Sequence, residues 1–146
     1  MNLSQHFTLG EAILSQTATR KGIDNTPSPE VEANMVEAAQ RMEEVRDLLD
    51  APILVSSWFR CLKLNSSIGS TSTSAHVQGW AIDFTAPQFG TPQDVAKAII
   101  AGGISFDQLI WEFESWVHIS FSPQNRQQVL TASMVNGNVV YTNGIG

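Results

Sequence analysis

Cysteine and positive charge are scarce in this sequence of 146 residues. A single cysteine, Cys61, excludes an internal disulfide and a cysteine-rich metal site, and its apolar neighbours predict a buried thiol. Lysine and arginine together number 8 against 14 acidic residues, which gives a net charge of −6, and they form no cluster. Because binding to nucleic acid needs a positive surface, we expect no nucleic-acid partner.

Long apolar runs are also absent. No stretch reaches the roughly 18 apolar residues of a membrane span. The first residues, Met1 to His6, lack the basic and apolar regions of a secretory signal, so we expect synthesis in the cytoplasm without a signal peptide. With 42% apolar and 15% charged residues the chain is globular, and its length predicts one domain over residues 1–146, which we expect to be a monomer.

Helix signals dominate the first third of the chain and strand signals the rest. The patterns predict helices that begin near Leu9 and that cover residues 29–50 and 92–101, and strands at residues 53–57, 80–84, 106–113, 116–121, 129–135 and 138–142. Asn136-Gly137 predicts a hairpin between the last two strands. Residues 65–73, rich in serine, threonine and glycine, are expected to form a surface loop. This order of elements predicts an α+β fold with a central antiparallel sheet.

Two of the three histidines accompany a carboxylate in a pattern suited to a metal ion. His76 and Asp83 are seven residues apart, so on one straight strand they would lie on opposite faces, and they can share an ion only if the chain bends between them. Gly79 permits such a bend, and His118 supplies a third ligand from another predicted strand. Zinc hydrolases hold zinc with three N or O side chains and leave the fourth position for water, whose pKa falls to about 7. The pattern therefore indicates a catalytic zinc site, and we expect His6 to lie outside it.

The candidate ligands lie in a motif that resembles the zinc D-alanyl-D-alanine carboxypeptidase family. The motif reads Ser74-x-His76-x-x-Gly79-x-Ala81-x-Asp83, followed by Trp116-Val-His118. The family includes the vancomycin-resistance dipeptidases, the phage L-alanyl-D-glutamate endolysins and the hedgehog signalling domain. The chain start up to Glu11, residues 22–27 and residues 57–60 are similar to small phage and prophage members. The resemblance implies helices packed on one side of the antiparallel sheet, and one zinc ion held by the two histidines and the aspartate.

A zinc peptidase also needs a carboxylate that takes a proton from water and passes it to the leaving amine. Glu112 and Glu114 both precede His118. A three-residue hairpin loop at residues 114–116 would place Glu112 directly across from His118, with Cβ atoms about 5 Å apart. The hedgehog branch likewise has its glutamate six residues before the last histidine, whereas other branches use Glu-x-x-His, a spacing at which this chain has Ser115. Glu112 is the favoured base, and the alternatives are Glu114 or neither.

Three further residues are candidates for contact with a substrate. Arg60 matches an arginine of the family, and its fork suits a substrate carboxylate or a developing oxyanion; the alternative is a salt bridge to a surface carboxylate. Ser74 either binds substrate or orients the loop that carries His76. Trp116 either walls the cleft or belongs to the core.

The resemblance implies a zinc metallopeptidase that hydrolyses amide bonds in the stem peptides of bacterial peptidoglycan. Endolysin-like cell-wall degradation by an L-Ala-D-Glu endopeptidase is favoured over D-Ala-D-Ala carboxypeptidase activity. Such an enzyme would act at the cell wall or in the periplasm after release. The alternatives are a non-catalytic binding module that contains zinc and a virion-associated protein.

Overall fold

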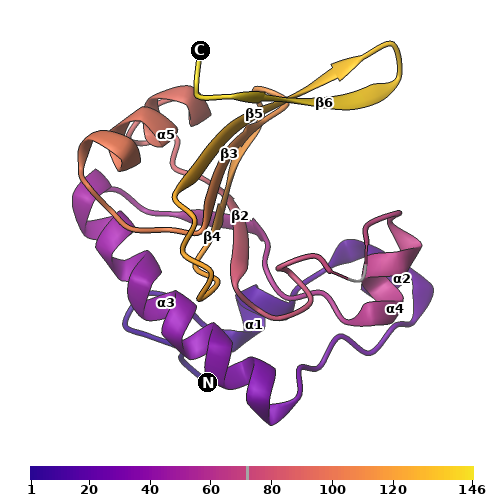
Figure 1. Ribbon diagram of the computed structural model, residues 1–146. Coiled ribbons are helices and arrows are strands. Elements are labelled where there is room, and N and C mark those ends of the chain that lie inside the picture. The colour runs from indigo at the N-terminus through magenta and orange to yellow at the C-terminus, as the bar shows by residue number, and fades with distance from the viewer. Residues whose placement is uncertain (72) are drawn as a thin grey trace.

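A computed structural model describes residues 1–71 and 73–146 and places a six-stranded sheet at the centre of the molecule (Figure 1). The strands lie in the order β1-β2-β4-β3-β5-β6. The helices are α1 (Leu9–Ile13), α2 (Gln16–Lys21), α3 (Pro29–Leu49), α4 (Leu62–Ser67) and α5 (Pro92–Ala101). The strands are β1 (Leu54–Ser57), β2 (Ala81–Thr85), β3 (Gln108–Glu112), β4 (Trp116–Ser120), β5 (Gln128–Val135) and β6 (Asn138–Asn143).

The two longest helices, α3 and α5, pack on one face of this sheet (Figure 1). Each begins as its sequence predicts, with Ser28 or Thr91 as the N-cap and a proline in the first helical position. Their apolar faces meet the buried residues of β2 and β4 in a common core. The other face of the sheet is therefore left open for polar side chains. Among the described residues, no helix is both long and apolar enough for a bilayer span.

Strand alternation separates the core from the polar face. In β2, Ile82 and Phe84 are fully buried in the core, so Asp83 between them points to the opposite face. In β4, Val117 and Ile119 are likewise in the core, and His118 points the other way. The helical layer thus fixes which side chains are available on the open face.

The predicted α+β fold with helices on one side is confirmed, with one departure in the sheet. Four neighbouring strand pairs are antiparallel, but β3 and β5 run parallel. The chain crosses from the end of β4 through residues 121–127 before β5 joins the far edge of β3. The hairpin of β5 and β6 turns at Asn136-Gly137, whose φ angles of 51° and 80° explain why these two residues predicted it.

Four local features differ from what the sequence predicts. Helix α2, capped by Ser15, was not predicted. Helix α4 covers the start of the predicted loop at residues 65–73; Ser72 of that loop lies outside the described residues. Its N-cap is Cys61, whose Sγ accepts a hydrogen bond from the backbone N–H of Leu64. The thiol is half-buried rather than buried. Strand β1, predicted to be buried, lies at the sheet edge and is half exposed.

Candidate metal centre

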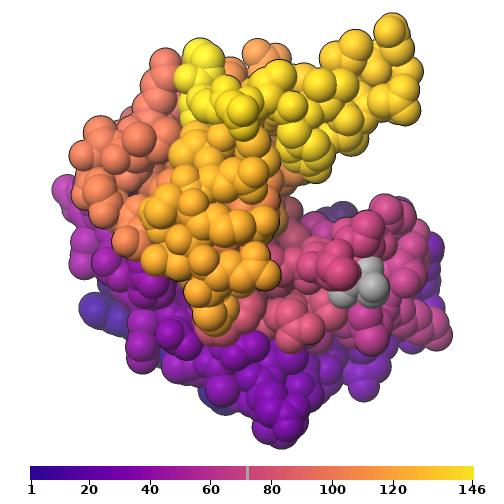
Figure 2. All heavy atoms as spheres, in the orientation of Figure 1, coloured from indigo at the N-terminus to yellow at the C-terminus, as the bar shows by residue number. Residues whose placement is uncertain are grey.

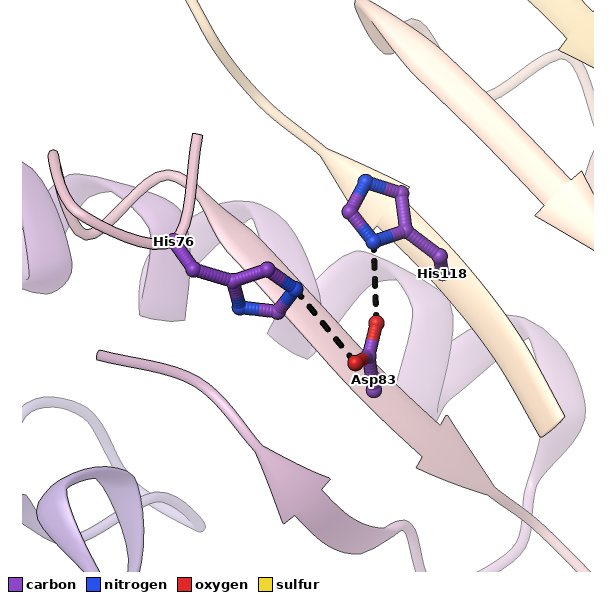
Figure 3. A group of neighbouring side chains, drawn as sticks. All are labelled: His76, Asp83 and His118. Carbon is purple, nitrogen blue, oxygen red and sulfur yellow. Dashed lines mark hydrogen bonds and ion pairs between the residues drawn. The ribbon is translucent and has the colours of Figure 1, made fainter. Parts of the chain in front are cut away.

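Three side chains from two strands and a loop converge on the open face of the sheet (Figure 3). Asp83 on β2 and His118 on β4 are direct partners in the antiparallel register. His118 Nδ1 lies 2.9 Å from Asp83 Oδ1, and His76 Nε2 lies 3.3 Å from Asp83 Oδ2. One donor atom from each residue lies within 4.8 Å of the other two. The structure therefore brings together the three residues that the sequence predicts as metal ligands.

His76 lies on the loop before β2, and the bend predicted at Gly79 brings it to the cluster. Gly79 has a φ of 79°, and a Cβ at this position would lie 2.6 Å from Met35 Cγ of α3. Glycine is thus required both for the backbone angle and for the close approach to α3. Ser74 Oγ accepts a hydrogen bond of 3.2 Å from the backbone N–H of His76, so Ser74 orients this loop.

Trp58 fixes which nitrogen of His76 is free. His76 Nδ1 lies 2.7 Å from the backbone carbonyl oxygen of Trp58, which can only accept a hydrogen bond. Nδ1 therefore carries a proton, and Nε2 is the nitrogen that faces Asp83. The indole N–H of Trp58 also donates to the carbonyl of Gly79, at 2.9 Å. Histidine ligands in metal sites are commonly held by such a hydrogen bond on the second nitrogen.

Asp83 is a buried anion at the centre of the cluster. Burial acts to raise its pKa, but the charge of His76 and the hydrogen bonds with His118 and His76 hold the pKa well below its usual value. The pKa of His118 is raised above its ordinary value; burial opposes this, and the hydrogen bond and charge of Asp83 outweigh it. Arg60 adds a further positive charge, with Nη2 at 3.3 Å from Asp83 Oδ2.

The donor set fits zinc. Two ligands held about 2.1 Å from zinc at a tetrahedral angle lie about 3.4 Å apart. Asp83 Oδ2 lies 3.3 Å from His76 Nε2, close to that separation, and one donor atom from each of the three residues lies within 4.8 Å of the others. Two imidazoles and one carboxylate are also the ligand types of catalytic zinc sites that keep one position open. His6 lies outside this group, as expected, and pairs instead with Glu43.

Glu112 lies beside the cluster, but in a different register from the predicted one. The hairpin loop is residues 113–115, so Glu112 pairs with Trp116, and Ile110 rather than Glu112 lies opposite His118. Ile110 is on the same face of the sheet as His118, its cross-strand partner. Glu112 is two residues after Ile110 on β3, so Glu112 also points to that face. Its Oε1 lies 3.8 Å from His118 Nδ1.

The environment of Glu112 is that of a partly buried acid. Burial raises its pKa above the ordinary value, and the charge of Asp83 adds to this, while His118 and a hydrogen bond from Trp116 oppose it. That hydrogen bond runs from Trp116 Nε1 to Glu112 Oε1, at 2.9 Å. Glu114 is exposed at the tip of the loop, as its predicted place in the hairpin requires.

The cluster lies in an open cleft of about 500 Å³. Figure 2 shows the surface hollowed between the C-terminal hairpin and the segment that contains α4 and the loop after it. All of the predicted site residues line this cleft: Arg60, Ser74, His76, Asp83, Glu112, Trp116 and His118. The cleft residues that were not predicted include Asp107, Arg126 and Tyr141. They belong to no spaced motif, and only the placement of β5 and β6 beside β3 brings the last two to the cleft.

Arg60 does not pair with a surface carboxylate, the alternative that the sequence left open. Its guanidinium is mostly buried, donates from Nε to Ser57 Oγ at 3.1 Å, and contacts Asp83. Burial lowers the pKa of Arg60, and the charges of Asp83 and Glu112 oppose that effect. Its other N–H donors have no hydrogen-bond partner within residues 1–71 and 73–146, and Arg60 lines the cleft.

Comparison with known proteins agrees with this geometry. The model of one protein family, described as Peptidase M15, matches residues 5–120. No curated protein matches the chain. The match covers more than half of the chain and includes the whole His76, Asp83 and His118 cluster together with Glu112. It confirms the resemblance to the zinc peptidase family, and the chain therefore belongs to the peptidase M15 family, whose members are zinc-dependent metallopeptidases.

Proposed function

We propose that this chain is an endolysin-type endopeptidase that cleaves the L-Ala-D-Glu bond of peptidoglycan stem peptides, as a monomeric single domain at the cell wall. Its family makes it a zinc peptidase that acts on peptidoglycan; the choice of bond and the role in lysis are the proposal. The similarity of its N-terminal segments to small phage members supports that choice. One observation carries the catalytic proposal: Glu112 lies 3.8 Å from a histidine of the metal cluster, at an open cleft.

The three clustered side chains are the proposed metal ligands. His76 offers Nε2, His118 offers Nδ1 and Asp83 offers a carboxylate oxygen. When bound there, zinc supplies the Lewis acidity that polarises the scissile carbonyl and lowers the pKa of water. Trp58 and Ser74 hold His76 in the orientation that this requires.

Glu112 is the proposed general base and acid. Its carboxylate takes one proton from water as the water oxygen bonds to the carbonyl carbon. The same group then gives that proton to the amide nitrogen as the C–N bond breaks, which yields an amine and a carboxyl product. A raised pKa suits a group that both accepts and donates the proton, and the indole of Trp116 keeps the carboxylate aimed at the cluster.

Arg60 is the proposed electrostatic partner. Its guanidinium is anchored by Ser57 and Asp83, so its remaining N–H groups have a fixed direction. They stabilise the negative charge that develops on the carbonyl oxygen, or a carboxylate of the substrate. Trp116 forms part of the cleft wall beside them.

The test is digestion of purified muropeptides, analysed by mass spectrometry. Zinc-loaded wild-type protein and the Glu112→Gln variant are compared, with zinc content measured in both. We expect the wild type to cleave one type of amide bond, and the variant to retain zinc but lose at least about 100-fold in rate.

Each outcome assigns a role. New termini at L-Ala and D-Glu support the endopeptidase, whereas release of terminal D-Ala identifies a carboxypeptidase. Unchanged cleavage by Glu112→Gln rules out Glu112 as the base. A zinc-loaded wild type that binds muropeptides without cleaving them is instead the non-catalytic module.

A further inference from the structure

The cleft wall opposite the His76 loop is built by residues beyond the family match. The match ends at residue 120, and four residues that line the cleft follow it: Ser122, Gln124, Arg126 and Tyr141. The metal cluster and Glu112 lie inside the matched part. This wall is therefore where the chain can add its own substrate contacts to the chemistry that it shares with its family.

Arg126 is the cationic residue of this wall, and a buried carboxylate holds it. Its Nε lies 2.8 Å from Asp107 Oδ1 and its Nη2 lies 2.9 Å from Asp107 Oδ2. The backbone N–H of Arg126 donates to the same carboxylate at 3.0 Å. Asp107 is only 2% exposed, whereas the Arg126 side chain is 48% exposed. One edge of the guanidinium is thus fixed to the protein, and the rest of the side chain is open to the cleft.

The guanidinium of Arg126 has a second edge, formed by N–H groups that do not contact Asp107. A guanidinium has five N–H donors, and the contact with Asp107 uses only two of them. The hydrogen bonds that Arg126 donates to Asp107 keep the guanidinium charged and raise its pKa above the ordinary value. The remaining donors include a pair, one on each terminal nitrogen, with the geometry that binds a carboxylate through two hydrogen bonds.

The backbone around Arg126 is strained in a way that fixes its direction. Asn125 and Gln127, on either side of it, have φ angles of 48° and 55°, a left-handed conformation that asparagine tolerates but that is uncommon for glutamine. Backbone hydrogen bonds from Gln127 to Phe106 and from Gln128 to Asp107 hold this turn against the start of β3. The ion pair with Asp107 explains the position of one edge of the Arg126 guanidinium. It does not explain why the other edge faces the cleft.

The distance between Asp107, which holds Arg126, and the level of His118 on the sheet corresponds to a few residues of a bound peptide. His118 is opposite Ile110 on β3, and Asp107 precedes Ile110 by three residues, which is about 10 Å along a strand. An extended peptide covers the same distance in about three residues. A group bound by Arg126 is therefore within a few residues of the scissile bond.

We propose that Arg126 binds a carboxylate of the substrate peptide through its unused edge and so sets the preference for acidic stem peptides. This rests on the proposed function, which places a stem peptide in the cleft. Two sources carry the same chemistry: the free carboxylate of the D-glutamyl residue and the C-terminal carboxylate of the peptide. Asp107 acts as the positioning residue for Arg126.

The test compares three synthetic stem peptides: one with both carboxylates free, one amidated at the D-glutamyl residue and one amidated at the C-terminus. Values of kcat and KM are measured for zinc-loaded wild type, Arg126→Gln and Arg126→Lys. We expect wild type to favour the free peptide, and Arg126→Gln to raise its KM by about tenfold or more with little change in kcat. If amidation of one carboxylate raises the KM of wild type, and Arg126→Gln does not raise the KM for that amidated peptide further, then that carboxylate is the one that Arg126 binds. Arg126→Lys keeps the charge but not the fork, so we expect partial recovery.

Binding gives an answer that does not depend on cleavage. Isothermal titration of the same peptides into Glu112→Gln protein, with and without Arg126→Gln, measures the preference directly. If wild type cleaves none of the peptides but this preference for the free peptide disappears with Arg126→Gln, the proposed activity fails and the carboxylate site stands. A preference unchanged by Arg126→Gln, or the absence of binding to any peptide, overturns the site.

Controls separate binding from folding. Arg20→Gln removes one positive charge from an exposed position on α2 and should leave the peptide preference as in wild type. If Arg126→Gln weakens all three peptides equally and lowers the melting temperature, Arg126 only neutralises Asp107, and the proposal is wrong.

Discussion

The indole N–H of Trp116 donates a hydrogen bond of 2.9 Å to Oε1 of Glu112, its direct partner across the β3–β4 hairpin. The same carboxylate oxygen lies 3.8 Å from His118 Nδ1. One side chain therefore fixes the position of the proposed base relative to the proposed metal ligands. The sequence offered two roles for Trp116, a wall of the cleft or a part of the core. The structure adds a specific contact, the hydrogen bond to Glu112.

Replacing Trp116 by phenylalanine should lower kcat more than it affects metal binding. The ring volume is largely kept, but Glu112 loses the donor that orients it, and a misplacement of about 1 Å costs up to about 100-fold in rate. We expect a loss of about tenfold in kcat, with one zinc retained, as measured by peptide hydrolysis and metal analysis.

Trp111→Phe is the matched control for this change. Trp111 is on the same strand but on the opposite face from Glu112, and its Nε1 has no hydrogen-bond partner within residues 1–71 and 73–146. Its loss should leave kcat near the wild-type value. Equal losses in the two variants would mean that the hydrogen bond to Glu112 has no catalytic role.

Zinc should stabilise the folded chain, and this stabilisation should need both clustered histidines. A ligand at about 100 times its Kd adds about 2.7 kcal/mol to the free energy of unfolding, provided that it binds only the folded state. For a chain of this size that corresponds to a rise of roughly 5 to 10 °C in the melting temperature. We expect this rise for metal-free wild type titrated with zinc, followed by calorimetry, and its reversal by a chelator.

Variants at the histidines show whether the stabilisation arises at the proposed site. His76→Ala and His118→Ala should each lose most of the zinc-induced rise, because each removes one of three donors. His6→Ala should keep all of it, since His6 pairs with Glu43 outside the cluster. One tightly bound zinc in His118→Ala would place the metal elsewhere.

The convergence of His76, Asp83 and His118 could be predicted because each step depends on local chemistry. Gly79 is the residue type that a left-handed bend requires, and strand alternation fixes the face of Asp83 and of His118. The register of Glu112 could not be predicted in the same way. Phe113 and Glu114 have φ angles of 54° and 57° without being glycine, so no residue type marks where the hairpin loop begins.

Long-range pairing explains what else the sequence did not predict. Asn136-Gly137 predicted the last hairpin, but nothing local indicates that β5 joins β3 in parallel. Arg126 and Tyr141 reach the cleft only through that pairing. Helix α4 forms where the serine-rich sequence favours a loop, and the buried side chain of Asn65 within it shows that tertiary packing overrides the local preference.

Gly79→Ala should weaken both the fold and zinc binding. The new Cβ would lie 2.6 Å from Met35 Cγ and 3.1 Å from the carbonyl oxygen of Val31, at a φ of 79°. Strain and overpacking together predict a loss of about 1–3 kcal/mol in the free energy of unfolding. Because the loop carries His76, zinc affinity should fall as well, as measured by competition with a chromogenic chelator.

Gly103→Ala separates the two causes. Gly103 has a similar φ of 71°, but a Cβ there would meet nothing within 4 Å. This variant should lose only about 1 kcal/mol and keep the wild-type zinc affinity. If both variants bind zinc as wild type does, the close approach of Gly79 to α3 does not position His76.

The contacts of Glu43 with the N-terminal segment should make the free energy of unfolding depend on pH. Its carboxylate accepts hydrogen bonds from Ser4 Oγ at 2.6 Å and from the backbone N–H of His6 at 2.7 Å, and it contacts the His6 ring. Burial acts to raise the pKa of Glu43, but these hydrogen bonds outweigh it and lower the pKa below its ordinary value. A lowered folded-state pKa gives stability that is present above the unfolded-state pKa of about 4.3 and is lost as the pH falls through the folded-state value.

Glu43→Gln should therefore destabilise the chain at pH 7 by about 1–2 kcal/mol, because a charged acceptor is lost from a mostly buried position. Urea unfolding should show this difference shrinking as the pH falls below about 4.3, where wild type also becomes protonated. Glu44→Gln is the matched control: its ion pair with Arg41 is exposed, so it should cost less than about 0.5 kcal/mol at either pH. A destabilisation by Glu43→Gln that is the same at pH 3 and pH 7 would show that its carboxylate charge does not hold the N-terminal segment on α3.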